Sequence, residues 1–148
     1  MGSKYIAFVL SAESRQDLLK LFPPKYVIPV CHHITLSFDD ASAEILAWLY
    51  GEFTGHGEEN VVPTMAVTEH CVDNGIECFR AAIVCHNNEH NLTYKHTRCD
   101  GKTYHITHSL DFGKHARDSC QVVSDIANIK RQIVLHLTGT VELLDHEN

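Results

Sequence analysis

The pattern His-Ile-Thr-x-Ser occurs twice in the chain, at residues 33–37 and 105–109. Because a β-strand sends alternate side chains to opposite faces, each copy predicts a strand with one polar face and one apolar face. The polar face of the first copy would carry Cys31, His33, Thr35 and Ser37, opposite Ile34, Leu36 and Phe38. That of the second copy would carry Thr103, His105, Thr107 and Ser109, opposite Tyr104, Ile106 and Leu110. Each strand is therefore expected to present an imidazole beside a hydroxyl.

A single His-x-Thr pattern is most simply part of a half-buried strand with no chemistry, since histidine is often buried in such positions. Two copies in matching strand contexts favour a function. Histidines with an ordinary pKa of about 6.5 can act as one neutral base and one protonated acid near neutral pH. That combination is what metal-free cleavage of a phosphodiester requires. The two threonine hydroxyls are placed to hold the phosphate.

On these two motifs the chain resembles the 2H phosphoesterase superfamily. This group includes bacterial 2'-5' RNA ligase-like proteins, cyclic nucleotide phosphodiesterases and the phage nucleases that destroy cyclic oligonucleotide signals (anti-CBASS nucleases). The family pattern is His, a hydrophobic residue, Thr or Ser, and a hydrophobic residue. Residues 33–36 fit it completely, whereas the second copy has His108 at the last position. We therefore expect His108 to replace an apolar core residue.

The resemblance implies an α+β fold of two lobes, with antiparallel sheets flanked by helices and a central cleft. It also implies a metal-independent phosphodiesterase with no cofactor. His33 and His105 would face each other across the phosphate as base and acid, in an order that the sequence leaves open. Thr35 and Thr107 would hold its non-bridging oxygens.

Substrates within this family differ, and the sequence has no specificity motif that selects one. A small nucleotide is expected, with a preference for cyclic oligonucleotide signals of the kind that the anti-CBASS nucleases cleave. RNA 2',3'-cyclic phosphate ends and 2'-5' linkages are the alternatives.

Two non-enzymatic alternatives remain open. Twelve histidines and six cysteines, including the neighbours His70-Cys71 and Cys85-His86, are compatible with a zinc-binding module. They are scattered, however, and no Cys-x-x-Cys pair occurs. A catalytically inactive binding protein of the same fold is the other alternative, although both histidines and both threonines are present.

Length and charge limit the possible functions. The 148 residues are 44% hydrophobic, which is enough for a single core, so we expect one domain over residues 1–148. The formal net charge of −7 argues against binding of long nucleic acid, which needs clustered Lys and Arg. The sequence lacks a signal-peptide pattern and an apolar run of about 18 residues. A cytoplasmic protein with reduced cysteines is expected, in the host cytosol if the protein is viral.

Periodicity predicts an alternation of strands and helices. In chain order, the expected elements are a buried strand at 5–10, a helix from Ser14 to Phe22, the first motif strand, a helix at 42–50 that buries Trp48, an exposed loop at 51–60, a hairpin of 61–72 and 76–86, a polar loop at 87–101, the second motif strand, a helix from Asp118 or Ser119 through Ile129, and a strand at 132–144. The polar loop suits an active-site lid. Its Tyr94, Lys95 and Arg98 are candidates to meet a base or a phosphate, although a solvated loop is the simpler interpretation.

Overall fold

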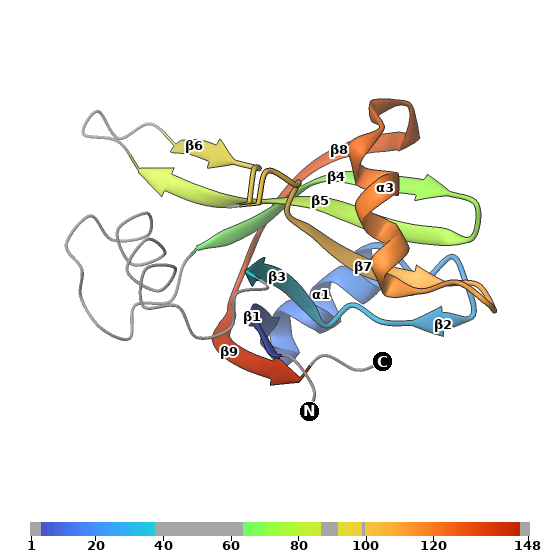
Figure 1. Ribbon diagram of the computed structural model, residues 1–148, viewed down its shortest axis with the longest axis horizontal. Coiled ribbons are helices and arrows are strands. Elements are labelled where there is room, and N and C mark those ends of the chain that lie inside the picture. The colour runs from blue at the N-terminus through green and yellow to red at the C-terminus, as the bar shows by residue number, and fades with distance from the viewer. Residues whose placement is uncertain (1–3, 38–63, 87–91, 99, 146–148) are drawn as a thin grey trace.

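The computed structural model describes residues 4–37, 64–86, 92–98 and 100–145. The described part is an α+β structure built on a single, mostly antiparallel sheet (Figure 1). Its strands are β1 (Lys4–Leu10), β2 (Ile28–Pro29), β3 (His33–Ser37), β4 (Met65–Asp73), β5 (Ile76–His86), β6 (Leu92–Lys95), β7 (His105–Leu110), β8 (Ile129–Leu137) and β9 (Gly139–Asp145). The main order is β8-β4-β5-β7-β3-β1-β9, with β2 beside β7 and β6 beside β5. The α+β class predicted from the sequence is confirmed.

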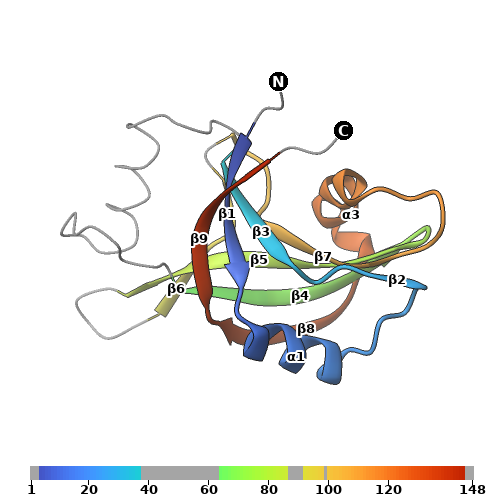
Figure 2. The same ribbon diagram turned by 90° about the horizontal axis from the view of Figure 1, so that it is seen from below.

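Helices α1 (Ala12–Leu21) and α3 (Ser119–Ser124) pack on opposite faces of the sheet. Leu18 of α1 shares a buried cluster with Phe79 of β5, whereas Val123 of α3 shares one with Cys78. Since Phe79 and Cys78 are consecutive in a strand, they point to opposite faces. Figure 2 shows that β9, β1 and β3 run at a steep angle to β4 and β5, so the sheet is strongly twisted. No helix in the described ranges is long and apolar enough to cross a membrane.

The first predicted strand and the predicted hairpin are confirmed as β1 and β4–β5. The hairpin turn uses Asn74 and Gly75, both at positive φ, as a tight turn between antiparallel strands requires. The first helix starts earlier than predicted. Ser11 is its N-cap and accepts a hydrogen bond from the Ser14 amide, whereas the Ser14 side chain is buried against Thr138.

Two further predictions were wrong in their boundaries. The helix expected through Ile129 ends at Ser124, because the Asp125 side chain accepts a hydrogen bond from the Ala127 amide and starts a 3-10 turn, η2 (Ile126–Asn128). The last strand is two strands that meet at Gly139. A Cβ there would overlap the Val9 carbonyl and the Phe8 ring, so only glycine lets the chain leave β8 and pair with β1.

The predicted polar loop at 87–101 is also different. Residues 92–95 form β6, which pairs with β5, and the chain then turns tightly back through a bridge between Thr97 and Thr103. The helix predicted at 42–50 and the loop predicted at 51–60 lie outside the described residues.

Candidate functional site

The two motif strands lie side by side at the centre of the sheet (Figure 1). They are antiparallel, and Ile34 pairs with Ile106. In such a pair the flanking residues also oppose one another on a common face. The register therefore sets each histidine opposite the threonine of the other copy, His33 opposite Thr107 and Thr35 opposite His105. All four predicted site residues share the face away from the Ile34–Ile106 core.

Both copies of the repeat carry a β-bulge at the same position. In β3, Thr35 and Ser37 pair with consecutive residues of β1, and Leu36 is the additional residue. In β7, Thr107 and Ser109 pair with consecutive residues of β5, and His108 is the additional residue. A bulge of this kind reverses the alternation of side chains. The two copies therefore share a backbone irregularity as well as a sequence pattern.

The bulges correct part of the predicted sorting of side chains. Ser109 does not share the face of His105, because its hydroxyl donates a hydrogen bond to Glu77 Oε1 at 2.6 Å. Leu110 joins the buried cluster under α3 and not that of Ile106. Cys31 was expected beside His33, but it precedes β3 with a φ of 44° and lies in the core. Strict alternation fails in each case because the backbone is irregular there.

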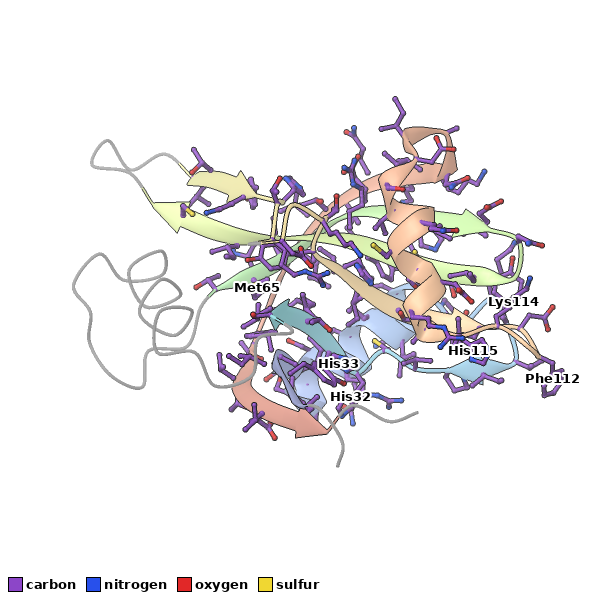
Figure 3. The ribbon with its side chains drawn as sticks, in the orientation of Figure 1. His32, His33, Met65, Phe112, Lys114 and His115 are labelled. Atoms are coloured by element: carbon purple, nitrogen blue, oxygen red, sulfur yellow. The ribbon has the colours of Figure 1, made fainter. Side chains whose placement is uncertain are left out.

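His33 is half-buried among polar side chains that sequence reasoning missed. Its Nε2 lies 3.2 Å from the Tyr5 hydroxyl, and its Nδ1 lies 3.0 Å from His32 Nδ1. Figure 3 shows the two histidines together at the start of β3. Burial, together with the charges of the neighbouring His32 and His105, lowers the pKa of His33 to about 4. Tyr5 could have been anticipated, because it alternates onto this face in the strand next to β3.

His105 is oriented by the backbone. Its Nδ1–H donates a hydrogen bond to the Thr103 carbonyl at 3.1 Å. This fixes the tautomer, so the neutral ring carries its lone pair on Nε2. Burial lowers the pKa of His105; the Thr103 carbonyl and Asp100 oppose the shift, while the positive charges of Arg98 and Lys102 add to it. These surroundings therefore favour the neutral form of His105.

The turn before β7 contains an ion pair beside His105, between a buried Arg98 and an exposed Asp100. Arg98 is only 3% exposed, and its Nε and one terminal nitrogen donate to the two carboxylate oxygens of Asp100 at 2.9 and 2.7 Å. The Asp100 carboxylate also accepts from the Lys102 amide, and Arg98 holds its pKa below the ordinary value. The interpretation of Arg98 as part of a solvated loop was wrong. The Asp-Gly sequence that follows is typical of a tight turn and was the available signal.

The two threonines differ in their hydrogen bonds. The Thr35 hydroxyl makes none to any residue that the structure describes. Thr107 is buried, and its hydroxyl donates to the Ala116 carbonyl at 3.3 Å and lies 2.8 Å from the Ser119 hydroxyl. Thr107 thus anchors the start of α3 to β7. Thr35 keeps its hydroxyl available for a ligand.

His108 occupies the core position predicted from the second motif. It is fully buried, its ring packs edge-on against Phe79, and its Nε2–H donates to the Phe22 carbonyl at 2.6 Å. Among the described residues, nothing bonds its Nδ1. Burial lowers the pKa of His108, so it stays neutral in the fold. His108 is a structural residue.

The zinc-binding alternative gains no support in the described ranges, where no three His, Cys, Asp or Glu side chains are arranged to hold a metal ion. His70 is hydrogen-bonded to Glu77, with its Nε2 2.8 Å from Glu77 Oε2. Cys71 is buried in the cluster beneath α3.

No family model, no curated protein and no solved structure matches the chain.

Proposed function

We propose that the protein is a metal-independent phosphodiesterase of the 2H type, with His33 and His105 as its acid–base pair. The observation that carries the proposal is the register of the two motif strands. It sets both histidines on one face with the Thr35 hydroxyl, which bonds to no described residue. The two imidazoles are close enough that a proton on His105 lowers the pKa of His33. A coincidental repeat has no reason to meet at its own centre.

The two histidines have different surroundings, which favours different roles. His105 presents the Nε2 lone pair, and burial and the neighbouring cations lower its pKa, so we assign it as the base that deprotonates water or a ribose 2'-OH. His33 is then the acid that protonates the leaving oxygen. Its pKa is low without substrate, so His33 takes up its proton when the anionic phosphate binds, since the negative charge favours the imidazolium. Thr35 donates to a non-bridging oxygen as charge develops there.

The substrate that we propose is a small nucleotide, with a preference for cyclic oligonucleotide signals over 2',3'-cyclic phosphates and 2'-5' linkages. The net charge of −7 favours a small anion over long nucleic acid. We place such an enzyme in the cytoplasm, where these nucleotides are made.

The finer fold assignment, two lobes related as in the 2H family, is part of the same proposal. Its support is internal: the pairs β1–β3 and β5–β7 repeat one another, each with a bulge after the motif threonine. The two halves then join through Ile34 and Ile106.

A substrate panel tests the function directly. Purified protein is incubated in EDTA with cyclic dinucleotides, 2',3'-cyclic mononucleotides and 2'-5' dinucleotides, and the products are separated by chromatography. We expect turnover of at least one class by the parent protein and none by the variant that lacks both histidines. Equal turnover by both proteins would indicate a contaminant and defeat the proposal.

A further inference from the structure

One row of directly opposed residues crosses the whole sheet on the face of the histidines. Successive residues of this row are directly opposite one another on adjacent strands. Thr35 lies opposite His105 because Ile34 pairs with Ile106. From β9 to β8 the row reads Glu142, Ala7, Thr35, His105, Arg80, Glu69 and Gln132. Directly opposed residues have Cβ atoms about 5 Å apart, so side chains in such a row form a continuous strip. The strip is polar from Thr35 onward.

The neighbouring row is different. From His33 it continues through Thr107 to Cys78 and Cys71. Its far end is buried beneath α3. A substrate held between His33 and His105 can therefore extend along only one of the two rows, towards Arg80.

The guanidinium of Arg80 is partly buried, yet most of its N–H donors have no hydrogen-bond acceptor among the described residues. One terminal nitrogen donates to Glu69 Oε1 at 3.2 Å, and the side chain is 20% exposed. Its Nε is buried without an acceptor, and its other terminal nitrogen makes no hydrogen bond to the described residues. Arginine offers a planar fork of donors that suits the two oxygens of a phosphate. In Arg80, only one terminal nitrogen of this fork donates to a described residue.

We infer that Arg80 binds a second phosphate of the substrate, one strand beyond His105. This rests on the proposed function, and it narrows the substrate to a nucleotide with a phosphate besides the scissile one, such as a cyclic or linear dinucleotide. A 2',3'-cyclic mononucleotide has a single phosphate and cannot reach Arg80 while it reacts. Glu69 accepts a hydrogen bond from the guanidinium and would compete with the incoming phosphate for it.

This arrangement predicts opposite effects for the two members of the ion pair. Arg80→Gln removes the ligand for the second phosphate, so KM for cyclic di-AMP should rise about 10- to 100-fold with kcat little changed. Glu69→Gln removes the competitor, so KM for the same substrate should fall. An ion pair that serves only stability would make both variants worse. Arg80→Lys, which keeps the charge without the fork, should recover part of the loss.

The comparison substrate is 2',3'-cyclic AMP, on which Arg80→Gln should leave KM within twofold. Arg117→Gln removes the same charge from an exposed position in the turn before α3 and serves as the control for net charge. Melting curves confirm that each variant is folded.

Binding without turnover separates the two hypotheses. Calorimetry with cyclic di-AMP uses the His33→Ala/His105→Ala protein, with and without Arg80→Gln. Binding that disappears with Arg80→Gln supports the subsite. Hydrolysis by the parent with KM unaffected by Arg80→Gln overturns the subsite alone. If the parent neither hydrolyses nor binds any nucleotide, the proposed function and the subsite both fail.

Discussion

Ile34 of β3 pairs with Ile106 of β7, and these two residues are equivalent, each at the centre of a His-Ile-Thr segment. An antiparallel pair that is centred on equivalent residues is locally two-fold symmetric. Each motif histidine therefore opposes the threonine of the other motif, and the two imidazoles are diagonal to one another. This placement brings both imidazoles to one face of the sheet, where the proposed acid–base pair would act on a phosphate.

Replacing either His33 or His105 with Ala should lower kcat/KM by about 10² to 10⁴, because the proposed mechanism gives each a separate proton transfer. The double variant should be little worse than the single variants if the pair acts as a unit. The melting temperatures of the two single variants should be close to that of the parent, since both side chains lie on the polar face. Steady-state kinetics on the substrate found in the panel checks this. If His33→Ala keeps nearly the activity of the parent, the paired-histidine mechanism is wrong and the repeat has only a structural role.

The pH optimum of kcat/KM should lie below pH 6.5. The free enzyme has the pKa of His33 lowered to about 4 and that of His105 lowered as well, so the singly protonated pair is most populated between those values. The optimum of kcat should lie at higher pH, because bound phosphate raises the pKa of the acid. Paired pH profiles measure both quantities. Coincident optima above pH 7 would contradict the electrostatics described here.

The two threonines should separate activity from stability. Thr35→Ala should lower kcat/KM by about tenfold with an unchanged melting temperature, since it removes one free hydroxyl donor. Thr107→Ala should destabilise the fold by about 1–3 kcal/mol, because it leaves the Ala116 carbonyl and Ser119 without their partner. Urea unfolding and kinetics are measured on both variants. The reverse assignment would show that Thr107 is the substrate ligand.

Activity should persist in EDTA, because the proposed chemistry uses imidazoles and a hydroxyl in place of a metal-bound nucleophile. Turnover is compared before and after dialysis against chelator, and then after addition of Mg²⁺, Mn²⁺ or Zn²⁺. Loss of turnover that a divalent cation restores would replace this mechanism with a metal-assisted one.

The protein should lose stability as the pH falls from 6.5 towards 4. The pKa values of His33, His105 and His108 are lower in the folded chain than their ordinary 6.5, so the unfolded chain binds more protons in this range. Their contribution is therefore complete above pH 6.5 and is lost as the pH falls through the folded values. The buried Glu77, whose pKa is also lowered, adds to the loss below its ordinary 4.5.

Urea unfolding at pH 7 and pH 5 measures this effect. His108→Leu should lose less stability between the two pH values than the parent, since one buried imidazole no longer needs to stay neutral. His136→Gln, at an exposed position of β8, is the matched control and should behave like the parent. An equal loss in all three proteins would show that the buried histidine is not the cause.

The sequence by itself determined the α+β class, the first strand, the β4–β5 hairpin and the two motif strands. These depend on local signals: the two-residue alternation of strands, and turn residues such as Asn74 and Gly75 that tolerate positive φ. The burial of His108 could also be predicted, because the family pattern places an apolar residue there.

Only the tertiary structure decided what surrounds the histidines. The bulges at Leu36 and His108 reverse the faces of Ser37 and Ser109, and a bulge depends on the partner strand, which local periodicity does not specify. Arg98 reads as a loop residue in sequence, yet it is buried against Asp100 beside His105. Arg80 reached the site only through the register of β5 against β7. Such contacts join residues distant in sequence, and hydrogen bonding between strands selects them.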